Sequence, residues 1–299
     1  MTDSAAPLRW ALFTSATPGG PPGALWDHPL AAGFDYLDLT AWVSVARKLE
    51  EACFDVIFWA DHSGVHDVYQ SSWRTAVREA VQFPSLDPLI LAAALASSTT
   101  ELGFAFSANV IQDHPYAFAR KLATVDHLTR GRVAWNIVTS FQPSAWRNLG
   151  YERVGSHTDR YGRAEEYLHV IYKLLEGSWA DDCVVRDRAR RLFAIPDRIR
   201  DIHHDGEHYR VPGIHTSEPS PQRVPVLFQA GGSDEGRTFA ATHAGRSVFS
   251  ATLGPFAATD RTIEYYATAT PNPRTTGKSP SLSAPVEAPA NVYTLNVLI

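Results

Sequence analysis

The sequence has 299 residues, of which 44% are hydrophobic and 20% charged, and its formal net charge is −5. This length can form one large α/β domain or two smaller ones, and the acidic balance argues against a general nucleic-acid binder, which usually carries a basic excess. The two cysteines are too few for a disulfide framework, and so few cysteines are consistent with a protein of the reducing cytoplasm. The N-terminus lacks the pattern of a signal peptide, and the longest apolar run, 89–96, is too short to span a bilayer. We therefore expect a cytoplasmic protein without membrane contact.

Strand-like apolar runs alternate with helical patterns up to residue 244, which is typical of βα units and a parallel sheet. Strands are predicted at 10–15, 56–61, 102–109, 133–140 and 225–231, with a shorter sixth at 248–251. Helices are predicted at 39–52, 87–97, 115–129, 158–176 and 234–244. Asp87 stands where it would cap its helix, and Cys53 is expected to be a buried, inert thiol.

Two segments break this alternation. Residues 180–222 are polar and carry several arginines and prolines, so they are interpreted as an insertion. Residues 253–299 are rich in Pro, Thr, Ala and Ser with little periodicity, and are predicted to form a divergent, disordered tail. The folded domain would then cover residues 1–252.

Polar residues at the C-terminal ends of successive strands favour a (β/α)8 TIM barrel, because functional sites lie at that end of the barrel. A doubly wound sheet is the competing architecture, but TSATPGGPPG stands where its Gly-rich fingerprint would follow the first strand. That segment is too rich in Pro to begin a helix directly. Only about six of the eight βα units can be counted, so the barrel is predicted to be incomplete.

The most informative segment is the strand VAWNIVTS, which is followed by the helix start HTDRY. Asn136, Thr139 and Ser140 would offer a planar ligand hydrogen bonds at the end of the strand. His157 and Tyr161 lie one helical turn apart, and together with the free N–H groups of that turn they suit an anion such as phosphate. Taken alone, a capping His157 and a core Tyr161 explain this helix start better.

A second anion site is suggested by AGGSDEGR, which joins a strand directly to a helix. Gly231 and Gly232 would let the backbone approach a phosphate, and Ser233 would cap the helix while offering its hydroxyl. A plain Gly-containing turn with a Ser cap explains the segment equally well. Asp61 and Asn109 follow other strands, and barrel geometry would bring them to the same mouth.

Metal and serine-nucleophile chemistry are disfavoured by the sequence. His203, His204, Asp205 and His208 form a local cluster, but adjacent histidines point in different directions, so a surface cluster is the better interpretation. No G-x-S-x-G elbow is present in the sequence. We therefore expect no metal and nominate no catalytic residue.

Several segments resemble the bacterial-luciferase-like flavin monooxygenases, most closely the branch that contains the nitrilotriacetate, EDTA, long-chain alkane and dibenzothiophene-sulfone monooxygenases. The matching segments are FWAD at 58–61, VQFPSLDP at 81–88, HPYAFARKLATVDHLTRGRVAWNIVTS at 114–140, HTDRYGRAEEYL at 157–168, HDGEHYRVPG at 204–213 and SPQRVPVLFQAGGSDEGRTFAA at 220–241. The likeness runs from about residue 9 to 244 and then stops, whereas members of this family continue with the last strands and helices of the barrel.

The resemblance implies a barrel that binds reduced FMN (FMNH2) supplied by a separate NAD(P)H:FMN reductase. In this family the flavin reacts with O2 to give a C4a-(hydro)peroxyflavin, which oxygenates a small organic substrate. Carried over by motif, the flavin-binding residues would be Asp61, Gln82, Asn109, Asn136, Val138, Thr139 and Ser140 for the ring and ribityl chain, and His157, Tyr161, Gly231, Gly232 and Ser233 for the phosphate. His66 stands where close relatives often have Tyr, and the insertion would form a lid over the mouth.

Two alternatives stay open at the level of sequence. The chain could be a non-catalytic, truncated remnant of such an enzyme, or a deazaflavin-dependent oxidoreductase of the same superfamily. The resemblance also implies a homo-oligomer. It does not identify the substrate.

Overall fold

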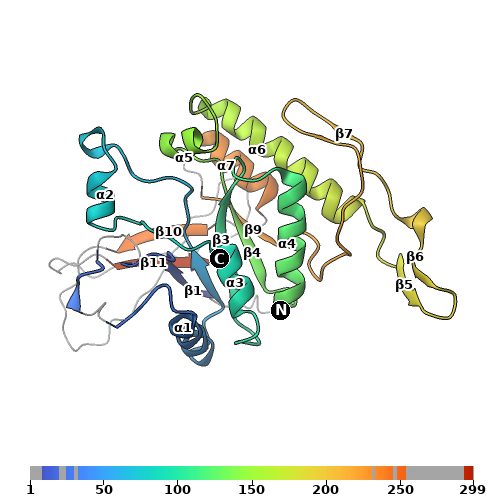
Figure 1. Ribbon diagram of the computed structural model, residues 1–299, viewed down its shortest axis with the longest axis horizontal. Coiled ribbons are helices and arrows are strands. Elements are labelled where there is room, and N and C mark those ends of the chain that lie inside the picture. Colours follow the sequence, from blue (N-terminus) through green and yellow to red (C-terminus); the bar gives the residue numbers. More distant parts are fainter. Residues whose placement is uncertain are drawn as a thin grey trace, which may run out of the picture. The chain divides into compact units, whose positions relative to one another are not determined.

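Five parallel strands form the centre of the structure, in the order β1-β2-β3-β4-β9 (Figure 1). Their bounds are Arg9–Thr14 for β1, Val56–Trp59 for β2, Gly103–Asn109 for β3, Val133–Val138 for β4 and Val226–Phe228 for β9. This computed structural model describes residues 9–19, 25–29, 33–230, 233–244, 248–253 and 293–298. The parallel order agrees with the predicted succession of βα units.

A helix follows each strand, as in a TIM barrel. These helices are α1 (Leu39–Glu51), α3 (Pro88–Leu95), α4 (Pro115–Thr129), α6 (His157–Tyr172) and α7 (Asp234–His243). Each begins at a side-chain cap, and the capping residues are Asp38, Asp87, His114, Ser156 and Ser233. Shorter helices, α2 (Arg74–Arg78), α5 (Pro143–Asn148) and the one-turn η2 (Tyr69–Ser71), lie within the loops after β2 and β4.

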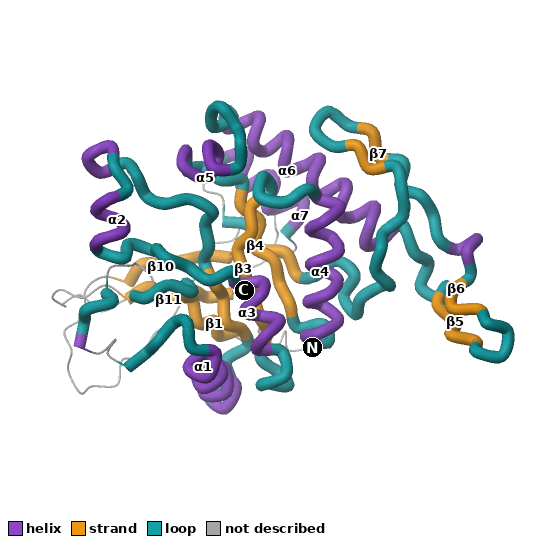
Figure 2. The backbone as a smooth tube through the Cα atoms, in the orientation of Figure 1, coloured by secondary structure: helices purple, strands orange, loops and turns teal. Residues whose placement is uncertain are grey.

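The strands present alternate residues to two sides. One set, which includes Trp59, Phe104 and Trp135, is fully buried in the core cluster together with residues of α3, α4 and α6. Figure 2 shows these helices in purple beside the orange strands. Because every second residue of a strand faces the same way, the other set must face the opposite side of the sheet.

That opposite side shows the curvature of a barrel. The ring of Phe58 on β2 lies 5.6 Å from that of Phe13 on β1 and 5.5 Å from that of Phe228 on β9, centroid to centroid. In a flat sheet the backbones of β2 and β9 would stand about 14 Å apart, since two strands lie between them. The small Ala105 and Ala134 occupy this face on those two strands, and they leave the space in which the rings meet.

The insertion after α6 consists of two small hairpins and long loops (Figures 1 and 2). A π turn (η3, Lys173–Gly177) ends α6 and leads to β5 (Val184–Asp187), β6 (Leu192–Ala194), the one-turn η4 (Pro196–Arg198), β7 (His204–Asp205) and β8 (Arg210–Val211). The β5–β6 hairpin leaves from a paired neck, in which Ala180 N donates to Arg198 O at 3.1 Å and Trp179 bridges to Ile199. It follows the C-terminal end of α6, so the expected lid over the mouth is not formed by this hairpin.

Contacts divide the chain into two compact units, Trp10–Ser247 and a second unit that combines Met1–Arg9 with Val248–Ile299. In the second unit β10 (Val248–Leu253) pairs antiparallel with β11 (Tyr293–Leu298). A strand is therefore confirmed at 248–251, but its described partner is antiparallel and does not extend the parallel series. The expected boundary after residue 252 falls inside β10, and most of the expected tail, 254–292, lies outside the described residues.

One cysteine differs from expectation. Cys183 is buried, but Cys53 is exposed, because it follows α1 in a turn with φ of 59°. The apolar end of α1 therefore does not bury its thiol.

Candidate functional site

The C-terminal ends of β3 and β4 place polar side chains on the curved inner face. Ser107 pairs in register with Asn136, and Asn109 pairs with Val138 two residues further along. The amide of Asn136 donates to Ser107 Oγ at 2.9 Å, and the amide of Asn109 donates to Ser63 Oγ at 2.8 Å. Both amides are thus held in fixed orientations at the edge where a barrel places its active site.

Ser140 turns the chain at the end of β4. Its φ is 56°, in the left-handed region, and its side chain is buried. Its carbonyl oxygen accepts hydrogen bonds from Trp146 Nε1 at 3.2 Å and from Arg160 Nη1 at 2.8 Å. Val138 and Thr139, just before this turn, are half-buried. Two side-chain donors therefore stabilise a backbone conformation that a serine seldom adopts.

The N-terminal turns of α6 and α7 lie side by side. Ser156 caps α6 in a capping box with Asp159, and Ser233 Oγ accepts from Gly236 N at the start of α7. His157 Nδ1 lies 3.6 Å from Glu235 Oε2, which joins the two first turns. Because helix N-termini carry unpaired N–H groups and partial positive charge, two of them together suit an anion. The first-turn carboxylates of Asp159 and Glu235 share this region.

Gln229 follows β9 and faces the same helix start. Its side-chain nitrogen donates to the hydroxyl oxygen of Tyr161 at 3.3 Å, and only 7% of its surface is exposed. The Tyr161 ring also lies 4.9 Å from that of His157 and 5.5 Å from that of Phe239 on α7. Tyr161 is therefore positioned by β9, α6 and α7 together.

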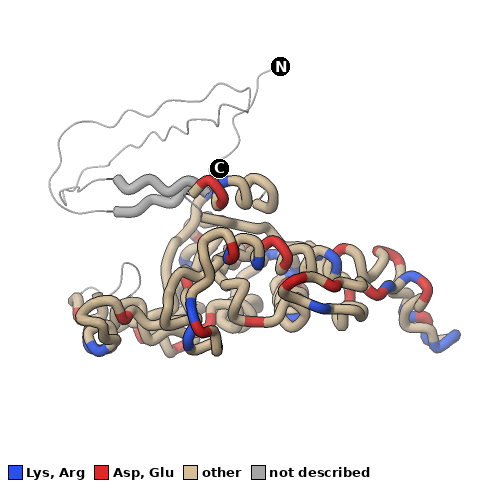
Figure 3. Tube along the Cα trace, turned by 90° about the horizontal axis from the view of Figure 1, so that it is seen from above, with Lys and Arg blue, Asp and Glu red and all other residues tan. Residues whose placement is uncertain are grey.

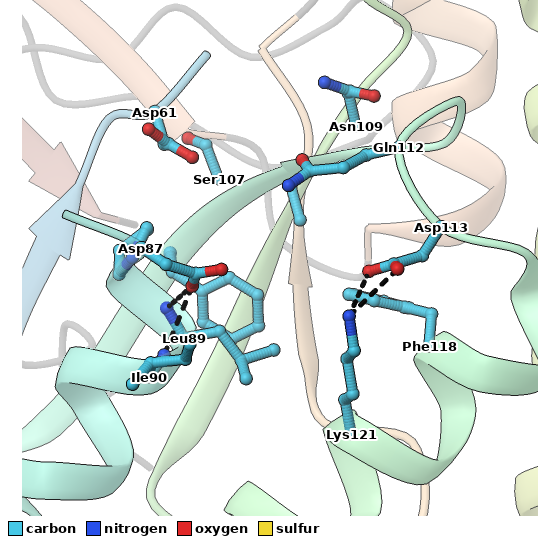
Figure 4. Close-up of a pocket in the computed structure, with 13 residues that line it drawn as sticks. Asp61, Asp87, Leu89, Ile90, Ser107, Asn109, Gln112, Asp113, Phe118 and Lys121 are labelled. Atoms are coloured by element: carbon cyan, nitrogen blue, oxygen red, sulfur yellow. Dashed lines mark hydrogen bonds and ion pairs between the residues drawn. The ribbon is translucent and has the colours of Figure 1, made fainter. Parts of the chain in front are cut away.

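Asp61 lies beside Ser107 at the edge of a small cavity that Asn109 also lines (Figure 4). Burial raises the pKa of Asp61 to about 7; a hydrogen bond with the His62 backbone opposes the rise, and the nearby carboxylate of Asp87 adds to it. The cavity, of about 160 Å³, extends between the starts of α3 and α4 to an ion pair of Lys121 with Asp113. Small-molecule pockets usually measure about 300 Å³ or more, so this cavity is too small to hold a flavin itself.

Gln82 lies in a second polar cluster, which joins the loops that follow β2 and β4. Its side-chain oxygen lies 3.1 Å from His66 Nε2, and His66 Nδ1 lies 3.5 Å from Gln142 Nε2. The ring of His62 meets that of His66 edge-on at 5.2 Å, and burial lowers the pKa of His62. Gly64 lets this loop approach α5, since a Cβ there would stand 2.5 Å from Ser144 Oγ.

Comparison with known proteins gives a consistent result. The sequence matches the luciferase-like monooxygenase family over residues 13–286. The chain belongs to this family. It is 50% identical over 220 residues to the long-chain alkane monooxygenase of Geobacillus thermodenitrificans (strain NG80-2), covering 74% of this chain and 50% of that protein. It is 47% identical over 219 residues to the dimethyl-sulfide monooxygenase of Hyphomicrobium sulfonivorans, covering 73% and 46%.

Solved structures of the family share this fold. The crystal structure of long-chain alkane monooxygenase matches with a TM-score of 0.77 and 46% identity, over 80% of this chain and 55% of that chain. A riboflavin lyase crystallised with modified FMN and riboflavin matches with a TM-score of 0.73 and 38% identity, over 79% and 52%. The fold is therefore the luciferase-like TIM barrel, and this chain spans about half the length of the relatives it matches.

In this member of the luciferase-like family, the candidate residues form two neighbouring groups joined by side-chain contacts. Asp61, Asn109, Asn136 and the 138–140 segment lie along β2 to β4, while His157, Tyr161 and Ser233 lie at the paired helix starts. Arg160 joins the groups through the Ser140 carbonyl. Gln82 lies apart, within the His66 cluster, and Gly231 and Gly232 lie outside the described residues.

Three residues of the site were not predicted from the sequence: Ser107, Arg160 and Gln229. Ser107 was hidden inside a strand, and only its register with Asn136 shows that it faces the mouth. Arg160 and Gln229 stand within the matching segments HTDRY and FQAGGS, which was the available signal.

His204, in the histidine cluster of the insertion, has a structural role. His204 Nε2 lies 3.1 Å from Glu166 Oε1, and its Nδ1 lies 3.4 Å from Lys173 Nζ, so it attaches the insertion to α6. Across the described residues, no three His, Cys, Asp or Glu side chains are grouped so as to hold a metal ion.

Neither the overall distribution of charge nor the hydropathy of the helices indicates a further extended binding surface among the described residues. Figure 3 shows basic and acidic residues intermixed along the trace in that view, without a large region of one sign. Among the helices that the structure describes, none is both long and apolar enough to cross a membrane.

Proposed function

We propose that this chain forms the flavin-binding part of a monooxygenase that uses reduced FMN and O2 to oxygenate a small organic substrate. One observation carries the proposal: the polar ends of β3 and β4 lie at the same edge of the sheet as the paired N-termini of α6 and α7. A planar, hydrogen-bonding ring and a phosphate need these two environments side by side.

The residues present fit FMN. The Asn109 and Asn136 amides and the segment 138–140 would hold the ring, and His157, Tyr161 and Ser233 would hold the phosphate with the N–H groups of both helix starts. When bound, reduced FMN supplies the reaction with O2, which no side chain can supply. The fixed hydrogen bonds at Asn136 and Ser140 would orient the ring without rearrangement.

Asp61 would act as a proton-holding group beside the ring. Because burial raises the pKa of Asp61 to about 7, its carboxyl can either keep or release a proton near neutral pH. The phenyl rings of Phe58 and Phe228 are buried on the same face, where they would exclude water.

The reductant and the substrate belong to the same proposal. We propose a separate NAD(P)H:FMN reductase as the source of FMNH2, and assembly of the working enzyme as a homo-oligomer. The names of the relatives, an alkane and a dimethyl-sulfide monooxygenase, support a small substrate of low polarity.

Anaerobic titration with reduced FMN tests this function. We expect saturable binding in the micromolar range, and His157→Ala should weaken it about tenfold through loss of one donor to the phosphate. His169→Ala, on the exposed side of the same helix, should change nothing. A folded protein that binds no reduced FMN would refute the proposal.

That negative result would favour the second candidate, a non-catalytic member of the same family. Binding of a reduced deazaflavin in place of FMN would instead assign the chain to the deazaflavin-dependent oxidoreductases.

A further inference from the structure

The β5–β6 hairpin, residues 184–194, extends away from the barrel as an arm (Figures 1 and 2). Its strands have four and three residues, and a two-stranded hairpin is at best marginally stable by itself in water. An ion pair of Arg186 with Glu218 joins it to the loop before β9. The hairpin therefore presents a small surface that a packing partner would stabilise.

One face of this hairpin is apolar and exposed. Leu192 and Ala194 are half-buried on one side of β6, so Phe193 between them faces the other side. Phe193 is 53% exposed, and Val185 on β5 is exposed as well. The guanidinium of Arg186 lies 5.6 Å from the centre of the Phe193 ring. Neighbouring exposed apolar side chains form a face that association can cover.

The tip of the hairpin, residues 188–191, is basic. It carries Arg188, Arg190 and Arg191, and Figure 3 shows basic residues at this end of the trace, at the right of the view. Arg190 pairs with Asp187 at 3.0 Å. Arg188 and Arg191 are exposed, and neither has an ion-pair partner among the described residues. Two positive charges are thus available to a partner.

The base of the arm, where it leaves the end of α6, is acidic. An open hollow of about 590 Å³ lies there, and its carboxylates are those of Glu176, Asp181 and Asp182. Asp181 pairs with Arg223 at 2.5 Å and Asp182 pairs with Arg198 at 2.7 Å, but the Asp181 side chain stays 92% exposed. Three carboxylates against two arginines give this hollow a negative balance.

The order along the arm is therefore acidic base, apolar middle and basic tip. An arm with this order is complementary to a second copy of itself that runs in the opposite direction. A two-fold axis through the middle brings the apolar faces together and each basic tip to the acidic hollow of the other copy, and contacts about such an axis must be self-complementary. The length fits, because base and tip are separated by the same strands in both copies. The net charge of −5 also favours the approach of arginines to another copy of this chain.

We propose that two copies of this chain associate through their β5–β6 hairpins, which pack antiparallel about a two-fold axis with the tip arginines of each copy in the acidic hollow of the other. This inference rests on the proposed homo-oligomer and names its surface. It does not depend on flavin binding, since the hairpin follows the C-terminal end of α6 and the candidate site lies at the N-terminal end of that helix.

Charge reversal at either end of the arm tests this pairing. The tip variant carries Arg188→Glu and Arg191→Glu. The base variant carries Asp181→Lys and Asp182→Lys. Each creates repulsion in both symmetric contacts and should raise the Kd of dimerisation at least tenfold at low salt, as measured by sedimentation equilibrium. Arg78→Glu on α2, whose side chain is also exposed, is the matched control and should leave the Kd unchanged.

A mixture of the two variants is the decisive experiment. In a mixed dimer one contact joins a Glu tip to a Lys hollow, and the other joins a wild-type tip to a wild-type hollow, so both contacts are attractive. An equimolar mixture should therefore recover dimers with a Kd within about threefold of the wild type, and native mass spectrometry should show that these dimers are mixed.

Phe193→Ala tests the apolar middle without a change of charge. It should weaken dimerisation about tenfold, because two rings leave the contact at once. The free energy of unfolding of the separate chain, measured at a dilution at which the wild type is monomeric, should hardly change. This variant keeps the inference testable if the base variant does not fold, which circular dichroism would show.

The possible outcomes separate this inference from the proposed function. If the wild type is a dimer whose Kd none of the folded variants changes, or if two weakened variants do not recover on mixing, the hairpin is not the interface and the proposed oligomer must use another surface. If the wild type is a monomer at every concentration, the proposed oligomer fails and the inference fails with it. Binding of reduced FMN is measured separately and should be equal in the tip variant and the wild type, so neither result refutes the flavin function.

Discussion

Asp61 shows how burial changes the chemistry of a single residue. Its carboxyl lies at the edge of the cavity beside Ser107, with Asp87 near enough to add repulsion. Both effects favour the protonated form, so the pKa of Asp61 is about 7 in the folded state against its ordinary value of 3.8. The charged form of Asp61 therefore opposes folding.

Because the charged form opposes folding, the Asp61→Asn variant should be more stable than the wild type, by an amount that grows with pH. The folded state binds the Asp61 proton more tightly than the unfolded state, so stability from this group is present at low pH and is lost as pH rises from about 4 to about 7. Asp61→Asn avoids the loss and should exceed the wild type by up to about 4 kcal/mol at pH 8. Urea denaturation at pH 4.5, 6 and 8 measures the difference.

Asp205→Asn is the control, since the Asp205 side chain is 76% exposed. Its difference from the wild type should be small at each pH. A gain in Asp61→Asn that does not grow with pH would contradict a raised Asp61 pKa.

At the residue scale, the sequence predicts which residues stand at the ends of strands and helices. It does not predict which side chains contact each other. Asn109 and Asn136 could be located because strand ends converge in any barrel. Gln229 and Arg160 could not, because their importance depends on burial between β9, β4 and α6, which are distant in the sequence. The prediction that Cys53 is buried was wrong for a related reason. Cys53 itself has a left-handed backbone conformation, and its side chain is exposed.

The approach of the β2 loop to α5 depends on Gly64. A Cβ there would lie 2.5 Å from Ser144 Oγ and 2.7 Å from the backbone nitrogen of Ala145, and backbone cannot move aside cheaply. Gly64→Ala should therefore destabilise the fold by about 2 kcal/mol and displace the His66 cluster. Gly162→Ala, on α6 with open space around it, should stabilise by about 1 kcal/mol. Chemical denaturation compares the two; equal effects would show that the close approach is unimportant.

One carboxylate of α6, that of Glu166, binds the β7–β8 segment of the insertion at several points. Glu166 accepts from His208 N and Tyr209 N, both at 2.8 Å, and pairs with His204. Burial alone would raise the pKa of Glu166, but these hydrogen bonds lower it below its usual value. The attachment should therefore weaken as acid pH protonates Glu166.

Glu166→Gln should release the β7–β8 segment while the barrel stays folded. Replacing a carboxylate that accepts several hydrogen bonds costs about 1–3 kcal/mol, and the loss is local to residues 204–211. Limited proteolysis and hydrogen exchange of that segment measure it. Glu165→Gln is the matched control, because Glu165 bonds to His243 of α7 instead. Unchanged protection at 204–211 in Glu166→Gln would contradict the attachment.

Element boundaries followed closely from the sequence where local chemistry was clear. The helix predicted at 115–129 has those bounds in the structure, because His114 and Pro115 begin it and Gly131 follows its end. The short α2 and α5 were not predicted, since each has too few residues to show a periodic pattern. The hairpins of the insertion were not predicted either, because their strands have only two to four residues and lie in a polar segment.

At the scale of the whole molecule, the ring of Phe58 on β2 contacts that of Phe13 on the neighbouring β1 and that of Phe228 on β9, which is not a neighbour of β2 in the sheet. Phe58→Ala should destabilise the fold by about 3 kcal/mol, because Phe58 is 8% exposed and contacts both other rings. Phe193→Ala on β6, which is 53% exposed, should cost less than about 0.5 kcal/mol. Thermal and urea unfolding give both values, and a similar loss in the two variants would argue against a curved core.

The paired neck of the β5–β6 hairpin has a consequence for how such proteins diversify. The chain leaves and re-enters through adjacent residues, with Arg200 N donating to Ser178 O at 2.8 Å and Ala180 N donating to Arg198 O at 3.1 Å. Segments of quite different length can therefore be exchanged between these anchors without stretching the barrel. Insertions of different length can therefore be accepted at this position, in evolution or in protein engineering, while the C-terminal ends of the strands stay unaltered.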